Sequence, residues 1–147
     1  MIELCGIAIR KRPRADMQPL ERCHISPQRG LEGDFRGKPG KRQLTLLSLQ
    51  SWQQVCAELN QDIPWWIRRA NLLVSGVEFG AHDVGKTLCF GDVVVQITRE
   101  TDPCKRMDEA VSGLRTALEP SWRGGVCCRV ITGGDAVIGQ RIEWLTR

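Results

Sequence analysis

Short runs of alternating or β-branched apolar residues dominate the chain, and they predict a mostly β protein. The clearest strand covers residues 42–49, and residues 2–10 and 126–131 follow the same pattern. Further strands are expected at residues 19–25, 72–75, 87–90, 93–98 and 136–145. Glycine-containing turns are expected at residues 91–92, where Gly-Asp is a hairpin signal, and at 133–135.

An apolar face at helical spacing predicts a helix over residues 50–59. Apolar side chains from Trp52 to Leu59 recur at three- and four-residue intervals on this face. Ser48 or Ser51 can accept a hydrogen bond from an unpaired amide at the start of the helix. The strand before this segment is therefore expected to lead directly into the helix.

A second helix is predicted over residues 105–118. Met107 and Leu118 lie on its apolar face, and Gly113 weakens its middle. Residues 64–67 are expected to form a short helical turn. Many short strands with glycine-rich turns and two or three inserted helices indicate a β-barrel with helical insertions.

Residues 27–40 form no regular element in this prediction. Four glycines and two prolines occur in these fourteen residues, which is too many for a helix or a strand. Glu32 and Asp34 lie among the turn glycines, followed by Phe35. The segment is either a plain surface loop or a shaped loop at a functional site.

Composition points to one ordinary globular domain over residues 1–147. The chain has 41% hydrophobic and 26% charged residues. No apolar run approaches the ~20 residues of a membrane span, and no signal peptide is recognisable, so a cytoplasmic protein without a membrane partner is expected. The net charge of +4 suits an anionic small ligand and is weak evidence for nucleic acid, which we do not expect as a partner.

The seven cysteines predict neither a disulfide framework nor a zinc site. Their number is odd, their spacing is irregular and no C-x-x-C motif occurs. His24 and His82 are far apart in the sequence. Most of the cysteines, including the adjacent pair Cys127 and Cys128, are expected to be small buried side chains.

Cys104 is the exception among the cysteines. Pro103 fixes the backbone in front of it, and Lys105 and Arg106 follow at the start of the predicted helix. A helix N-terminus and neighbouring cations favour a thiolate, which attacks electrophiles and binds soft metals. The alternative interpretation is a structural thiol in a loop.

Two further segments can bind an anion. Arg68 and Arg69 precede Asn71 at the entrance of a predicted strand, and paired guanidinium groups match phosphate or carboxylate. Gly124-Gly125, followed by Arg129, can let backbone amides approach an anion closely. The alternatives are a solvated arginine pair and a plain hairpin turn. The glycine pair has neither the P-loop nor the dinucleotide-binding pattern.

The ordered series of these landmarks resembles the MOSC domain, the C-terminal domain of molybdenum cofactor sulfurase. The resemblance runs from about Gly30 to Leu145, and the ordered series carries it, not any single motif. Its members are Gly30-Leu31-Glu32-Gly33-Asp34, Arg42, Arg69-x-Asn71-Leu72, Gly76, Gly85, Gly91, Pro103-Cys104, Gly124-Gly125, Arg129-Val130 and Gly139. Ala70 stands where the family usually has glutamate, and residues 36–40 lack the His-Gly-Gly run of many stand-alone members.

The resemblance implies a barrel fold, a cofactor and roles for particular residues. Cys104 corresponds to the cysteine that ligates molybdenum or carries sulfur, so it is the expected catalytic residue and metal ligand. The implied cofactor is the molybdenum cofactor (molybdopterin), and at family level an association with pyridoxal phosphate also follows. The resemblance implies that Arg42, Arg69 and Asn71 lie around the cofactor pocket. With the residues already noted for their charge or backbone amides, namely Lys105, Gly124, Gly125 and Arg129, they are the residues expected to bind the cofactor.

Three functions remain open at this point. Larger relatives such as the mitochondrial amidoxime reducing component imply an oxidoreductase that reduces N-hydroxylated bases or related small molecules. It would receive electrons from a partner protein. A sulfur carrier would instead hold a persulfide on Cys104 and receive sulfur from a cysteine desulfurase. A non-catalytic binding module is the third possibility.

Overall fold

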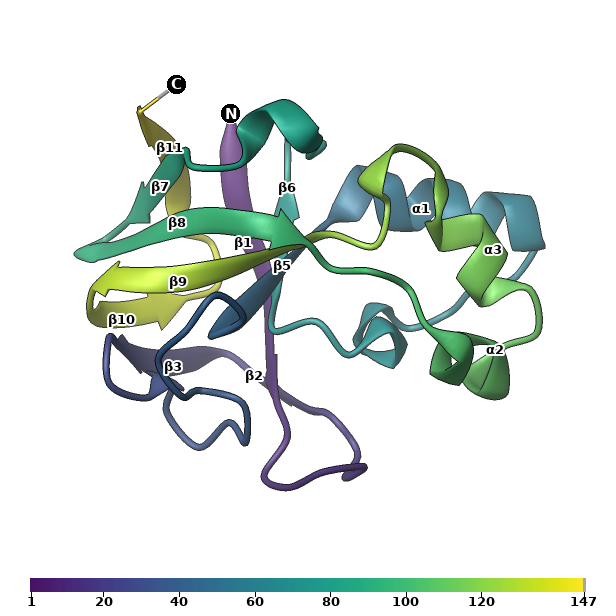
Figure 1. Ribbon diagram of the computed structural model, residues 1–147, viewed down its shortest axis with the longest axis horizontal. Helices are drawn as coiled ribbons and strands as arrows, with labels where there is room; N and C mark the ends of the chain where they lie inside the picture. Colours follow the sequence, from purple (N-terminus) through teal and green to yellow (C-terminus); the bar gives the residue numbers. More distant parts are fainter. Residues whose placement is uncertain (147) are drawn as a thin grey trace.

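The computed structural model describes residues 1–146, and their main element is a closed barrel (Figure 1). Its strands are β1 (Ile2–Ile9), β5 (Leu44–Ser48), β6 (Leu72–Ser75), β7 (Thr87–Phe90), β8 (Val93–Glu100), β9 (Val126–Thr132) and β11 (Arg141–Thr146). They are hydrogen-bonded in the order β11-β7-β8-β9-β5-β6-β1, and the antiparallel pair of β1 with β11 closes the ring. The predicted β-barrel with helical insertions is confirmed.

The only parallel pair of the described barrel is β5 with β6. Parallel neighbours need a long crossover, and α1 (Leu49–Leu59) supplies it on the outside of the barrel. The Ser48 hydroxyl accepts a hydrogen bond from the Ser51 amide at 3.2 Å, as the capping pattern predicted. The helix ends at Asn60, which adopts the left-handed conformation with φ 52°.

A small second sheet lies against one end of the barrel (Figure 1). It consists of β10 (Gly134–Val137), β3 (Arg22–Ser26) and β4 (Gly30–Leu31), while β2 (Gln18–Leu20) extends the barrel beside β1. The prediction that residues 133–135 form a turn and that residues 136–145 form one strand is therefore wrong in part. Gly134 already pairs with Ile25, and the turn falls instead at Gly139, where φ is 99°.

The predicted helix over residues 105–118 is two short helices, α2 (Lys105–Ala110) and α3 (Leu114–Leu118). Val111 has left the helical region, and Gly113 has φ 85°, a conformation that breaks the helix and suits glycine. Short 3-10 helices of three or four residues also occur, namely η1 (Trp65–Arg68), η2 (Ala81–Asp83) and η3 (Pro120–Trp122). Within residues 1–146 no helix is long and apolar enough to cross a membrane.

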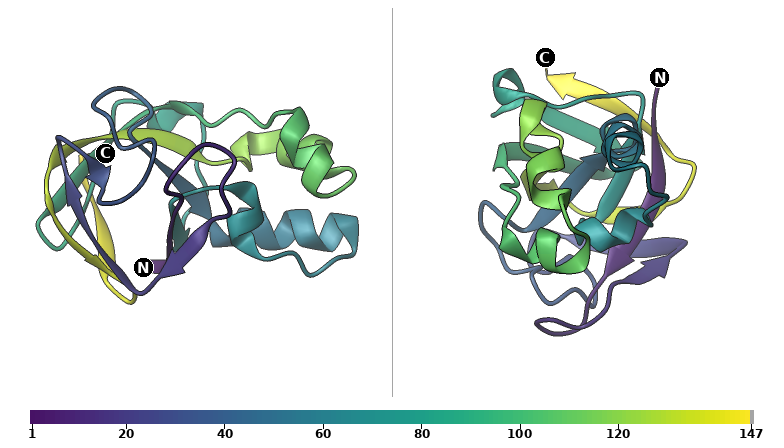
Figure 2. Two further views of the ribbon diagram at one scale, coloured as in Figure 1. Left: turned by 90° about the horizontal axis from the view of Figure 1, so that it is seen from below. Right: turned by 90° about the vertical axis from the view of Figure 1, so that its right-hand side faces the viewer.

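Two separate hydrophobic cores support these elements. The first fills the barrel with inward-facing side chains such as Leu4, Leu44 and Phe90. The second lies between the barrel wall and the helices, where Trp52 and Leu118 are buried. Figure 2 shows the helices gathered on one side of the barrel.

Candidate functional site

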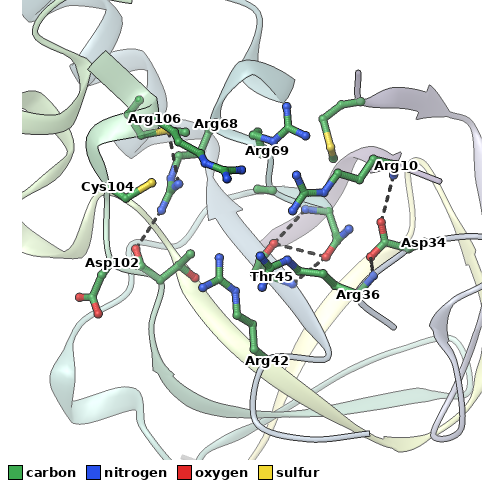
Figure 3. Close-up of a pocket in the computed structure, with 15 residues that line it drawn as sticks. Arg10, Asp34, Arg36, Arg42, Thr45, Arg68, Arg69, Asp102, Cys104 and Arg106 are labelled. Carbon is green, nitrogen blue, oxygen red and sulfur yellow. Dashed lines mark hydrogen bonds between the residues drawn. The ribbon is translucent and has the colours of Figure 1, made fainter. Parts of the chain in front are cut away.

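A cavity of about 220 Å³ opens between the barrel wall, η1 and the segment that leads into α2. Figure 3 shows its charged side chains converging from several elements. It is lined by Arg10, Met17, Asp34, Arg36, Arg42, Thr45, Arg68, Arg69, Ala70, Asn71, Thr101, Asp102, Cys104, Arg106 and Met107.

Arg68 forms the buried wall of the cavity. The residue is 5% exposed, and its guanidinium donates from Nε to the Gly124 carbonyl at 3.1 Å and from Nη2 to the Thr101 carbonyl at 2.9 Å. Its Nη1 lies 3.5 Å from Sδ of Met107. All three partners are uncharged. Burial and the nearby Arg42 guanidinium lower the pKa of Arg68 to about 10.

Arg69 points the opposite way because the chain turns sharply at the end of η1. Its φ of 69° and ψ of 26° are left-handed, and its amide donates to the Trp66 carbonyl at 2.9 Å. The Arg69 Nη2 donates to the Ala15 carbonyl at 2.7 Å, which ties the loop after β1 to the cavity. The two consecutive arginines therefore lie on different walls of the same cavity. Arg68 contacts the segments of Thr101 and Gly124, and Arg69 contacts the loop after β1.

Asp34 fixes the glycine-rich loop at the opposite rim. Its carboxylate accepts hydrogen bonds from the amides of Arg10 at 3.0 Å and Arg36 at 3.3 Å. The Phe35 ring contacts both guanidinium groups, with their central carbons 5.5 Å and 5.8 Å from its centroid. The loop over residues 27–40 is thus a shaped loop that brings Arg36 to the cavity beside Arg10, rather than a plain surface loop.

Asn71 forms the floor of the cavity and joins three barrel strands. Its Oδ1 accepts from the Thr45 amide at 3.1 Å, and its Nδ2 donates to the Ala8 carbonyl at 3.2 Å. The Asn71 amide donates to the Thr45 hydroxyl at 3.0 Å. These bonds satisfy a buried amide and fix the register of β1, β5 and the entrance of β6.

Cys104 lies at the mouth of the cavity, on the segment that Arg68 holds through Thr101. It occupies the N-cap position of α2, it is exposed and it is a free thiol. Its side chain makes no capping hydrogen bond to α2. The thiol is therefore open to a ligand in the cavity, and Figure 3 shows it beside Arg68 and Arg106.

The charges around the cavity are strongly unbalanced, with six arginines against two aspartates in its lining. Burial, followed by repulsion from neighbouring arginines, lowers the pKa of Arg10 to about 10. Burial is also the first cause of the lowered pKa values of Arg36 and Arg69. The second cause is repulsion, from Arg42 on Arg36 and from Arg106 on Arg69. An anion bound among these groups would relieve this repulsion.

The imbalance extends to the surface around the mouth. Residues 10–17, 36–42 and 105–106 hold ten of the 21 Lys and Arg residues of the chain and one acid, Asp16. Subtracting them leaves 11 basic and 16 acidic residues, so these segments carry +9 and the remainder −5. Figures 1 and 2 show that the three segments lie on the same side of the molecule.

Arg68, which the sequence analysis weighed together with Arg69, lines the cavity. Of the eight residues expected to bind the cofactor or the metal, four also line it, namely Arg42, Arg69, Asn71 and Cys104. The other four lie outside the cavity lining. Lys105 and Arg129 are exposed. The Gly124 carbonyl accepts the hydrogen bond of Arg68, and a side chain at Gly125 would collide with the Leu46 carbonyl.

Sequence reasoning did not single out Arg10 and Arg36, and weighed Arg106 only as a neighbour of Cys104. Arg10 ends the first strand and Arg36 lies in the glycine-rich loop, so a lone arginine at either position looks like a solvated charge. The available signal was the density of basic residues in three short segments. Among residues 1–146, no group of three or more His, Cys, Asp or Glu side chains is arranged to hold a metal ion.

Comparison with known proteins agrees with this architecture. The sequence profile of the MOSC domain matches residues 21–143, which is most of the chain. The chain belongs to the MOSC domain family. A search of curated protein sequences gave no match.

Solved structures share the fold of this MOSC domain at low sequence identity. The YuaD protein from Bacillus subtilis has a TM-score of 0.82 and 18% identity, over 97% of this chain and 94% of that chain. YiiM from Geobacillus stearothermophilus has a TM-score of 0.79 and 15% identity, over 100% of this chain and 76% of that chain. YiiM from Escherichia coli has a TM-score of 0.73 and 15% identity, over 99% of this chain and 70% of that chain.

Proposed function

We propose that this MOSC domain binds the molybdenum cofactor at the arginine-lined cavity and reduces N-hydroxylated bases or related small molecules. The observation that carries the proposal is the exposed Cys104 thiol at the mouth of a cavity lined by six arginines and two aspartates. Soft thiolate ligands suit molybdenum, and an anionic cofactor suits unneutralised arginines.

The residues present fit such a group. A metal bound by protein atoms alone would need several ligands, and no such cluster occurs within residues 1–146. A cofactor that brings its own sulfur ligands needs one soft donor from the chain, and Cys104 supplies it. The phosphate of the cofactor would be held by Arg42 and Arg69, with Arg10 and Arg36 close by. When bound, the cofactor would supply the two-electron redox chemistry.

The chain itself supplies geometry and charge in this proposal. Arg68 orients the segment before Cys104 through the Thr101 carbonyl. Asn71 holds the strands beneath the cavity in register, so that neighbouring arginines keep a fixed spacing. Arg106 lies beside Cys104 (Figure 3), where its guanidinium would face the anionic cofactor.

The molybdenum content of the purified protein tests the proposal. The protein is produced in a host that makes the cofactor, and the metal is measured by mass spectrometry. We expect molybdenum in the wild type and its loss in Cys104→Ser. Cys89→Ser is a matched control, because Cys89 is a half-buried cysteine on β7 that does not line the cavity, and it should keep the metal. Absence from the wild type, or equal content in Cys104→Ser, would contradict the proposal.

A sulfur carrier is the second candidate, and the exposure of Cys104 favours it. Its thiolate would attack the outer sulfur of a desulfurase persulfide. The sulfur–sulfur bond of the donor would break, and the desulfurase cysteine would leave as a thiolate. Incubation with a cysteine desulfurase and cysteine should then add the mass of one sulfur atom to the wild type and none to Cys104→Ser. No added mass on the metal-free wild type would exclude this function.

A further inference from the structure

A second cavity adjoins the first and differs from it in chemistry. It is a groove of about 640 Å³ between η1, α2 and the loop after β1. It shares Met17, Arg69, Arg106 and Met107 with the arginine-lined cavity, so the two lie side by side. The groove is lined by Arg14, Asp16, Met17, Trp66, Ile67, Arg69, Arg106, Met107, Glu109 and Ala110.

Half of the side chains that line this groove are apolar, in contrast to the arginine-lined cavity. Trp66 is the only aromatic residue among them, and Ile67, Met17 and Met107 lie around it. Methionine sulfur makes favourable contacts with the edges of aromatic rings. Aspartate, glutamate and arginine side chains at the rim offer both acceptors and donors of hydrogen bonds.

Trp66 is held in place by its neighbours. Its ring meets the Trp65 ring edge-on, with centroids 6.2 Å apart and planes at 79°. The Trp65 ring in turn lies directly on Gly6 of β1, where a side-chain carbon would come within 2.7 Å of it. The half-buried Trp66 is therefore a fixed aromatic surface, which binds a flat ring without losing much rotamer freedom.

We propose that this groove binds a flat aromatic ring against Trp66, with the polar end of the same ligand passing between Arg69 and Arg106 toward Cys104. Two ligands of the proposed function contain such a ring, namely the pterin of the cofactor and an aromatic N-hydroxylated substrate. The direction toward Cys104 rests on the proposed function. The ring site itself rests on the lining of the groove and on the packing of Trp66.

Direct binding to the metal-free protein tests the ring site. The probes are 6-carboxypterin, benzamidoxime and the aliphatic acetamidoxime, measured by calorimetry with wild type, Trp66→Ala and Trp66→Phe. We expect at least one ring probe to bind roughly fivefold or more tightly than acetamidoxime, and Trp66→Ala to remove this preference. Trp66→Phe should keep most of it.

Trp144→Ala is the matched control. Trp144 is also half-buried but lies on β11, outside the groove, so its removal should leave the ring preference unchanged. The proposal is overturned if the wild type shows no preference for a ring, if Trp66→Ala retains the preference, or if Trp144→Ala removes it equally. Thermal melting of each variant shows that it is folded.

Molybdenum content distinguishes the two sources of the ring. If the pterin occupies the groove, Trp66→Ala loses molybdenum together with binding of 6-carboxypterin. If the substrate occupies it, Trp66→Ala keeps its molybdenum and loses only the preference for benzamidoxime. Ring binding in a wild type that never carries molybdenum would keep the ring site and exclude the proposed function. If molybdenum binding depends on Cys104 but the wild type shows no preference for a ring, the proposed function is kept and the ring site is excluded.

Discussion

Two clusters of charged side chains on different sides of the barrel differ in how their charges are balanced. Around η2, the carboxylate of Asp83 is 4% exposed, and its own turn supplies its hydrogen-bond and ion-pair partners. Lys86 lies 3.2 Å and His82 3.4 Å from its Oδ1, and the Gly80 amide donates to its Oδ2 at 3.0 Å. The arginine-lined cavity has six guanidinium groups and only two carboxylates.

The difference lies in where the neutralising charge comes from. Asp83 is satisfied within its own turn, so the cluster around η2 stabilises the fold without any further partner. In the cavity, Asp34 uses its oxygens on backbone amides, and Arg68 donates to uncharged groups. The six arginines therefore outnumber the two aspartates of the lining. In the proposed function, an anionic ligand would neutralise this excess of positive charge.

The largest expected effect is on the paired cluster. Asp83→Ala should lower the free energy of unfolding by about 2–3 kcal/mol, because the buried acceptor of three donors is lost. Urea denaturation measures the change. Asp135→Ala is the control, since Asp135 also pairs with a histidine, His24 at 2.9 Å, but at an exposed position. The free energy of unfolding of that variant should stay within about 0.5 kcal/mol of wild type. An equal loss of stability in both variants would show that the buried cluster around η2 is no more important for the fold than an exposed pair.

Inorganic phosphate should act on the unpaired cluster. An anion that binds only the folded state stabilises it by about 1.4 kcal/mol at ten times its Kd. We expect phosphate to raise the Tm of the wild type above its value in chloride of equal ionic strength. Arg42→Gln should reduce the rise, whereas Arg115→Gln should not, because Arg115 lies on α3 beside Glu119 and away from the cavity. Equal rises in all three proteins would mean that the cavity has no special affinity for anions.

The barrel could be predicted from the sequence because its strands carry local signals. Alternation of apolar residues identified β5 and β9, and Ser48 was among the predicted caps of α1. The division of residues 105–118 into two helices depends on one left-handed glycine, Gly113. Gly134 pairs with Ile25, more than a hundred residues earlier, so no local pattern distinguishes this strand from a turn.

The cavity was predictable only in part. Cys104 has a local signature in its proline and flanking cations, and the Arg-x-Asn segment is recognisable in sequence. Arg10 and Arg36 reach the cavity only because Asp34 folds the glycine-rich loop onto the end of β1. The opposite directions of Arg68 and Arg69 follow from the left-handed turn at Arg69. Such long-range and conformational causes leave no pattern in a single sequence.

Arg10→Met should sharpen the comparison by stabilising the ligand-free protein. Burial and the neighbouring arginines lower the pKa of Arg10 to about 10, so its charge costs stability at every pH below that value. This cost is lost as the pH rises from about 10, the pKa of Arg10 in the folded protein, toward the ordinary pKa of arginine. We expect a gain of about 1 kcal/mol at pH 7, reduced by the lost contact with Phe35. Urea denaturation without phosphate measures it, and a destabilised variant would show that Arg10 is structural.

Glu100→Gln should give the smallest effect, and it concerns the acids beside the cavity. Burial, followed by the nearby Asp102 carboxylate, raises the pKa of Glu100. The folded state therefore binds this proton more tightly than the unfolded state, and stability is lost as the pH rises through the folded pKa. The variant should melt roughly 1–2 °C above wild type at pH 7 and at the same temperature as wild type in acid, where both side chains are neutral. Melting curves of the two proteins between pH 4 and pH 7 test this. If the difference in melting temperature does not depend on pH, repulsion between Glu100 and Asp102 is not its cause. Unpaired charge around the cavity would then be confined to the arginines.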